Sequence, residues 1–159
     1  MPLSTQNSIN ELPSLVPYSL RDGFSFFIIK PDAVKRHLVG EILLILENRN
    51  FKIIELHSIW PTLSLVTHHY AEHTTKDYFI DIVPTLIDPD PCITGTVVHR
   101  EMPNSTIFFL RELVGPYDNP PENSIRGHYA LNSRYNSFHS SDSQSNAIRE
   151  RKLWKPKTA

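Results

Sequence analysis

The chain has 159 residues, of which 40% are hydrophobic, and this suits one globular domain and argues against a disordered protein. Its 16 basic residues nearly balance its 17 acidic ones, so no overall charge favours nucleic acid or an acidic membrane surface as a partner. Cys92 is the single cysteine, which excludes an intrachain disulfide framework, and the longest apolar run, Ile42 to Leu46, is far too short to cross a membrane.

Residues 1–23 are polar and interrupted by prolines, which indicates an extension outside the core. They lack the basic start and the apolar stretch of a secretory signal. Because a lone cysteine is typical of a reducing compartment, we expect a cytoplasmic protein. The folded domain is expected over residues 24–154, followed by a short tail over 155–159.

The first elements along the chain are expected to be a strand, a helix and a second strand. Residues 24–30 are aromatic and β-branched, which favours a central strand. Apolar residues then recur at helical spacing over 40–48. Residues 52–60 alternate as in a strand, although Ile53 and Ile54 interrupt the period of two.

The middle of the chain predicts three helices and a strand. One helix is expected over 63–73 and a short one over 77–83, which Pro84 should end or bend. Residues 93–99 form the third expected strand. A helix over 104–114 is indicated by an asparagine at its start and a glycine after its end.

The last third begins with a proline-rich loop over 115–124 and a fourth expected strand over 135–138. The segment from Ser141 to Gln144 matches a capping box, which predicts a final helix to about Lys152. Four strands alternating with helices indicate a compact α/β or α+β sandwich, with its helices expected on one side of the sheet.

Three short strings combine charge, hydroxyl groups and a histidine around these turns. Residues 30–34 (KPDAV) place a lysine where a buried strand ends. Residues 111–116 (RELVGP) and 124–127 (SIRG) place two arginines on either side of a stiff loop, where planar guanidinium groups can bind phosphates. Residues 136–142 (NSFHSSD) place a histidine between a strand and a capped helix.

Together these strings resemble the nucleoside diphosphate kinase family over residues 24–154. The resemblance rests on K-P-D-x-V, I-R-G and N-x-x-H-x-S-D in this order. It implies an α+β, ferredoxin-like αβ sandwich, in which helices cover a four-stranded antiparallel sheet, in agreement with the strand count. It also implies transfer of the γ-phosphate of a nucleoside triphosphate to a diphosphate by a ping-pong mechanism. The implied partners are ATP, GTP, ADP, GDP and other nucleotides, with Mg²⁺ held mainly by their phosphates, and a homo-oligomer of the chain.

The resemblance further implies roles for eleven residues. His139 matches the nucleophile, and a neutral imidazole suits this role because it is nucleophilic near pH 7 and forms a labile phosphoramidate. Glu150 matches the carboxylate that orients the ring through its other nitrogen, and Ser141 matches a supporting serine. Tyr78 and Ile82 match the positions beside the base. The residues that match nucleotide-binding positions are Lys30, Tyr70, Tyr78, Ile82, Arg111, Tyr117, Arg126 and Asn136.

Two positions depart from the family pattern. Ser140 follows the histidine where glycine is usual, and we expect backbone strain there. Tyr117 stands where a threonine usually binds phosphate, and its hydroxyl reaches further. These departures support an alternative: a weakly active or inactive member that acts as a nucleotide-binding or scaffolding module, with residues 1–23 as a docking segment.

Two further expectations concern the surroundings of His139. If Ser141 caps the last helix, the N-terminal amides of that helix would favour a negatively charged phosphohistidine. His68, His69 and His73 form an H-H-x-x-x-H pattern, and the second and third would share a helix face. Because no carboxylate or cysteine stands at a familiar metal-site spacing, we interpret them as solvated helix histidines and expect no protein-built metal site.

Overall fold

The computed structural model describes residues 22–157. Residues 1–21 of the expected extension and residues 158–159 of the expected tail therefore lie outside the described residues. Four antiparallel strands form one sheet in the order β2-β3-β1-β4. The strands are β1 (Ser25–Ile29), β2 (Phe51–Ile59), β3 (Cys92–His99) and β4 (Phe138–Ser140).

Seven α-helices and two short 3-10 turns accompany these strands in the described part of the chain. None of these helices is long and apolar enough to cross a membrane. The helices are α1 (Pro31–Val34), α2 (Val39–Asn48), α3 (Leu63–His69), α4 (Phe79–Leu86), α5 (Thr106–Val114), α6 (Ile125–Tyr129) and α7 (Gln144–Leu153), and the 3-10 turns are Ala71–His73 and Pro103–Ser105.

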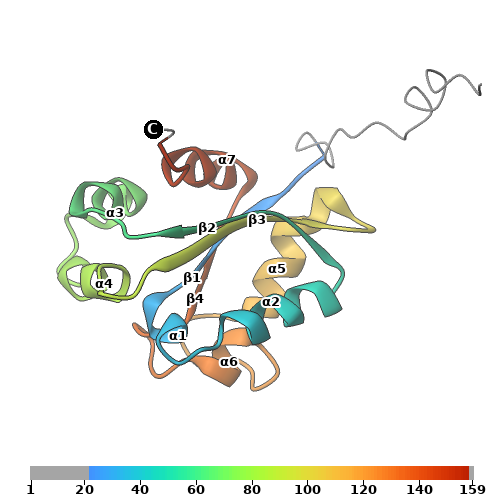
Figure 1. Cartoon of the computed structure of the whole chain (residues 1–159), viewed down its shortest axis with the longest axis horizontal. Coiled ribbons are helices and arrows are strands. Elements are labelled where there is room, and N and C mark those ends of the chain that lie inside the picture. The colour runs from blue at the N-terminus through green and yellow to red at the C-terminus, as the bar shows by residue number, and fades with distance from the viewer. Residues whose placement is uncertain (1–21, 158–159) are drawn as a thin grey trace, which may run out of the picture.

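The helices cover both faces of the sheet, as Figure 1 shows, with α3, α4 and α7 on one side and α2, α5 and α6 on the other. Every residue of β1 is buried. Phe27 packs into the core beneath α2 and α5, whereas Phe26 and Ile28 pack with residues of α3, α4 and the end of α7. The expected ferredoxin-like α+β arrangement is confirmed. The expectation of helices on one side is wrong, because a strand that is apolar on both faces needs a cover on each.

The first three strands lie within one residue of their expected ranges. In β2, Ile53 pairs with Val97 and Glu55 pairs with Thr96, so Ile54 is the extra residue of a β-bulge. That bulge explains the interrupted alternation. The fourth strand was misplaced: residues 135–138 were expected, and the strand covers Phe138–Ser140. Ser137 has a left-handed φ of 70°, which ends extended pairing before Phe138.

Two helix ends differ from expectation for identifiable reasons. The helix expected over 63–73 ends at His69, where the Arg149 guanidinium donates to the carbonyls of His68 and His69. Pro84 lies inside α4 instead of ending it. The carbonyl that loses its partner there belongs to Ile80, which is 75% exposed, so water can satisfy it.

Two helix starts also differ. The helix expected from residue 104 begins at Thr106 after a 3-10 turn, and the Thr106 hydroxyl donates to the carbonyl of Pro103. Helix α6 was not predicted, because it has only five residues. Ser124 caps it by accepting a hydrogen bond from the Gly127 amide at 3.0 Å.

Candidate active site

The sheet brings the lysine and histidine strings side by side. His139 lies in β4 directly opposite Ile28 of β1. Lys30 follows β1, and its amide donates to the carbonyl of Ser137 at 2.9 Å. Two motifs more than 100 residues apart in the chain are therefore joined by backbone pairing.

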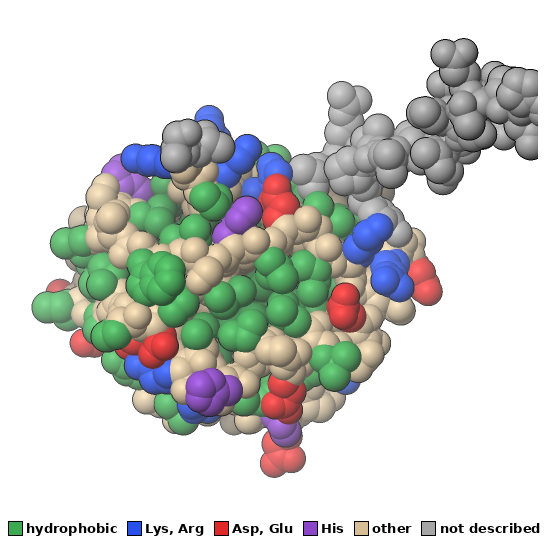
Figure 2. All heavy atoms as spheres, in the orientation of Figure 1, with side chains coloured by type: hydrophobic (Ala, Val, Ile, Leu, Met, Phe, Trp, Pro, Cys, Tyr) green, Lys and Arg blue, Asp and Glu red, His purple; other side chains and the backbone are tan. Residues whose placement is uncertain are grey.

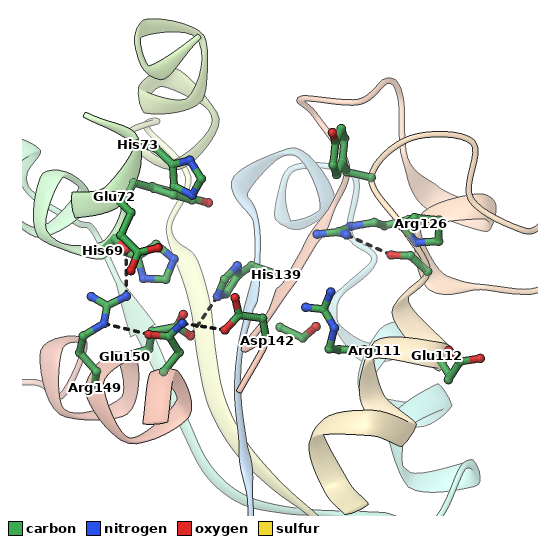
Figure 3. Close-up of a pocket in the computed structure, with 16 residues that line it drawn as sticks. His69, Glu72, His73, Arg111, Glu112, Arg126, His139, Asp142, Arg149 and Glu150 are labelled. Carbon is green, nitrogen blue, oxygen red and sulfur yellow. Dashed lines mark hydrogen bonds and ion pairs between the residues drawn. The ribbon is translucent and has the colours of Figure 1, made fainter. Parts of the chain in front are cut away.

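A chain of hydrogen bonds fixes the imidazole of His139 (Figure 3). Its Nε2 lies 3.1 Å from Oε2 of Glu150, and the Ser141 hydroxyl donates to the same carboxylate oxygen at 2.6 Å. Glu150 is 4% exposed and Ser141 is fully buried. A carboxylate can only accept, so Nε2 carries the proton of a neutral ring and Nδ1 keeps its lone pair.

Ser141 therefore supports Glu150 and does not begin the last helix. Ser143 is the N-cap of α7, and its hydroxyl accepts from the Asn146 amide at 3.1 Å. The predicted capping box is wrong because the hydroxyl of Ser141 is already engaged by Glu150. His139 contacts α7 through Glu150, two turns inside the helix, and the effect of the N-terminal amides on a phosphohistidine stays a prediction.

His69 is a buried member of the site that the sequence interpretation missed. It is 4% exposed, and Trp154 Nε1 donates to its Nδ1 at 3.0 Å. Indole nitrogen can only donate, so His69 is neutral with its proton on Nε2. Burial and the neighbouring His139 hold the pKa of His69 well below its usual value. The expectation that His69 is solvated is wrong. In the sequence, the partner that explains its burial, Trp154, lies 85 residues away.

His69, His139 and Glu150 form the one group of potential metal ligands in residues 22–157, with one ligand atom of each within 4.8 Å of the others. The Nδ1 lone pair of His69 is already used by Trp154, and the Glu150 carboxylate already accepts two hydrogen bonds. A cation held by His69 would have to displace the Trp154 hydrogen bond or the Nε2 proton, so the donor set fits a positioned imidazole better than a metal.

Two adjoining cavities meet at His139. One is about 570 Å³ and the other about 400 Å³. Ten of the eleven expected site residues line one or both of them, and Ser141 lies behind Glu150. The first cavity contains Tyr70, Arg111, Tyr117, Arg126, His139 and Glu150, and the second contains Lys30, Tyr70, Tyr78, Ile82, Tyr117, Arg126, Asn136 and His139.

The cations of the site differ in how firmly they are held. The Arg126 guanidinium donates to the carbonyls of Phe138 and Gly115, which leaves two of its five N–H groups for a ligand. Burial lowers the pKa of Lys30 to about 8, and the Arg126 charge adds to that effect. Arg111 is exposed on α5 and lines the first cavity. The second cavity is thus lined by cations without a carboxylate among its described residues, whereas arginines and carboxylates share the first.

Uncharged groups complete the second cavity. Burial raises the pKa of Tyr70 above its usual value, so its hydroxyl stays a donor at any physiological pH. The Asn136 side chain is buried, and its Oδ1 has no hydrogen-bond partner among the described residues. Tyr78 is held by a 2.6 Å contact between its hydroxyl and Nδ1 of His73.

A hydrogen-bond network of Asp32, Arg36 and Ser137 was not predicted from the sequence. The Ser137 hydroxyl donates to Asp32 Oδ2 at 2.9 Å, and Arg36 donates to both groups. This network holds Ser137 in its left-handed conformation two residues before His139. Ser140, in contrast, is an ordinary strand residue without positive φ, so the strain expected there is absent. Asp32 of the K-P-D string is therefore structural.

Comparisons with known proteins agree with this geometry. The family model for nucleoside diphosphate kinase matches residues 24–159. A nucleoside diphosphate kinase of Saccharopolyspora erythraea is 38% identical over 132 residues, covering 81% of this chain and 93% of that protein. The enzyme of Methanothermobacter thermautotrophicus is 38% identical over 133 residues, covering 82% and 85%.

Solved structures show the same likeness. A nucleoside diphosphate kinase family protein from Babesia bovis superposes with a TM-score of 0.73 at 32% identity, covering 84% of this chain and 88% of that one. A halophilic nucleoside diphosphate kinase from Halobacterium salinarum in complex with CDP superposes with a TM-score of 0.76 at 28% identity, covering 86% and 89%. The chain therefore belongs to the nucleoside diphosphate kinase family.

Proposed function

We propose that the chain is a nucleoside diphosphate kinase that moves a phosphoryl group from a nucleoside triphosphate to a nucleoside diphosphate through His139. The observation that carries the proposal is the oriented imidazole. Its Nε2 is engaged by the buried carboxylate of Glu150, and it lies where two cavities meet that share Arg126 in their lining. The free Nδ1 is the proposed nucleophile.

In the first half-reaction, Nδ1 of His139 attacks the γ-phosphorus of the triphosphate. An N–P bond forms while the bond from that phosphorus to the β–γ bridging oxygen breaks, and the diphosphate leaves with the electron pair. The imidazole becomes positively charged, and Glu150 stabilises it through Nε2–H. A second diphosphate then attacks the phosphohistidine, which breaks the N–P bond and restores the neutral ring.

The cations around His139 would stabilise the transferring phosphoryl group. Charge in such a transition state spreads over the equatorial oxygens, so fixed cations close to the phosphorus lower the barrier. Lys30, Arg111 and Arg126 are the proposed set, and all three line the cavities beside His139. With a pKa of about 8, Lys30 is mostly charged at pH 7.

The second cavity fits the nucleoside. Asn136 offers an unpartnered acceptor for a ribose hydroxyl, and Tyr78 with Ile82 offers an aromatic and an apolar surface for the base. Mg²⁺ would arrive with the nucleotide, where it neutralises phosphate charge.

We further propose that the protein is cytoplasmic and forms a homo-oligomer. The buried Cys92 suits a reducing compartment. Figure 2 shows hydrophobic side chains gathered across the middle of one face, with charged groups mostly around them. Such a patch is typical of an interface between protein chains. Large exposed apolar side chains include Leu44, Trp60, Leu63, Phe108 and Ile148.

Labelling with γ-labelled ATP tests the proposed reaction. The protein should take up label that is acid-labile and alkali-stable, and added diphosphate should remove it. His139→Ala should abolish labelling, whereas the matched variant His128→Ala, at an exposed position on α6, should label normally. Nucleotide binding by calorimetry without any labelling would instead support a binding or scaffolding module.

A further inference from the structure

Arg134 stands at the base end of the second cavity, outside the set of residues assigned above. Its guanidinium carbon lies 5.1 Å from the centre of the Tyr78 ring, and both side chains line the cavity. Among residues 22–157 this guanidinium has no hydrogen-bonding or ion-pair partner. A half-buried arginine with all five N–H groups free is poised to bind a ligand.

The loop that carries Arg134 is shaped by its own hydrogen bonds. Asn132 Oδ1 accepts from the amides of Arg134 and Tyr135 at 2.9 and 2.8 Å, and the Leu131 amide donates to the carbonyl of Tyr135 at 2.9 Å. The backbone at residue 134 is therefore held in place, and the side chain reaches the cavity from a fixed point.

A nucleotide with its terminal phosphate at His139 must extend its base toward Tyr78 and Ile82, the aromatic and apolar end of the cavity. A base stacked on Tyr78 enters the space that the Arg134 guanidinium borders. The guanidinium must then move to an edge of the base, where hydrogen-bond complementarity decides how well the base is accepted.

Guanine is the base that matches an arginine fork. Its O6 and N7 are adjacent acceptors, and they bind guanidinium in a bidentate manner. Adenine places an amino donor beside N7, and cytosine also presents an amino donor, so each opposes one arm of the fork. Stacking on Tyr78 alone does not distinguish these bases.

We propose that Arg134 is a specificity-determining residue that favours guanine nucleotides by binding the O6 and N7 edge of the base. This inference rests on the proposed kinase function. The phosphate end of the site already has its own cations in Lys30, Arg111 and Arg126, whereas Arg134 lies over the ring on which the base would stack.

The test compares GDP with ADP as phosphate acceptors. Arg134→Met, which keeps an unbranched apolar stem but removes the guanidinium, should lower the ratio of kcat/KM for GDP to that for ADP by about tenfold. The rate with ADP should not fall. The control variant Arg100→Met changes an exposed arginine after β3, at the end of the sheet opposite to Lys30, and should keep the wild-type ratio.

An altered substrate tests the same contact without changing the protein. 7-Deazaguanosine diphosphate lacks N7, so the wild type should phosphorylate it with a much smaller preference over ADP than it shows for GDP. Arg134→Met, which has no guanidinium to bind N7, should use GDP and 7-deazaguanosine diphosphate almost equally well. An equal fall for all diphosphates in Arg134→Met, or an unchanged ratio, overturns the inference. A wild type that phosphorylates no diphosphate defeats the proposed function itself, so the two failures are distinguishable.

Discussion

Replacing Glu150 by glutamine tests how much phosphorylation depends on the carboxylate that holds His139. The carboxylate is 4% exposed and accepts from His139 Nε2 at 3.1 Å and from Ser141 Oγ at 2.6 Å. Glutamine keeps the shape and one acceptor but removes the charge. A hydrogen bond to a charged group contributes about 1.5–3 kcal/mol and a neutral one about 0.5–1.5 kcal/mol, so the midpoints of the two ranges differ by about 1.25 kcal/mol. Phosphorylation of His139 should therefore slow by about tenfold.

Alanine at the same position should be more damaging. It leaves two donors, His139 Nε2 and Ser141 Oγ, without their buried partner, which costs about 2–3 kcal/mol and slows phosphorylation roughly a hundredfold. Quenched-flow single-turnover labelling measures both rates, and urea unfolding shows whether each variant is folded. Glu47→Gln, at an exposed position on α2, is the control. A glutamine variant as fast as the wild type, or as slow as the alanine variant, would refute this reasoning.

Three other changes have defined outcomes. Asp32→Ala removes one of the two acceptors of the Ser137 hydroxyl and the carboxylate partner of Arg36, and should lower the free energy of unfolding by about 1–3 kcal/mol in urea titrations; an unchanged midpoint would count against the network. Trp154→Phe removes the donor to His69 Nδ1, and ¹⁵N NMR of the imidazole should show its single tautomer becoming a mixture. Since burial lowers the pKa of Lys30 to about 8, its charge is lost above that pH, and kcat/KM should fall there in the wild type but not in Lys30→Met. Stability should instead rise between about pH 8 and 10.5, because the unfolded chain then holds the Lys30 proton more tightly.

Most of the fold was predictable from local patterns. A strand that is apolar on both faces, such as 24–30, indicates a central position whatever its partners are. Ile53 and Ile54, which interrupt the alternation in the sequence, lie at the β-bulge of β2. Short elements were missed or misplaced, as with the five-residue helix α6 and the three-residue strand β4, because so few residues carry no periodicity.

The site residues were predictable only where a family motif in the sequence contains them or fixes their positions. The family resemblance implied that Glu150 orients His139, and the structure places the two side chains in contact. The surroundings of His139 depend on distant partners that no local pattern reveals. Trp154 reaches His69 across 85 positions, and Asp32 reaches Ser137 across 105. Ser141 looked like a helix cap because a hydroxyl before a helix usually is one, yet a carboxylate on the next helix engages it.

The position of the phosphoryl group on His139 is the most direct test of the proposed mechanism. The wild-type protein, phosphorylated with ATP and kept at alkaline pH, can be studied by ³¹P–¹H and ¹⁵N NMR, which distinguish the two ring nitrogens. Because Nε2 is engaged by Glu150 at 3.1 Å, the phosphoryl group should be on Nδ1 of His139. A phosphoryl group on Nε2, on another residue or on none would contradict the mechanism.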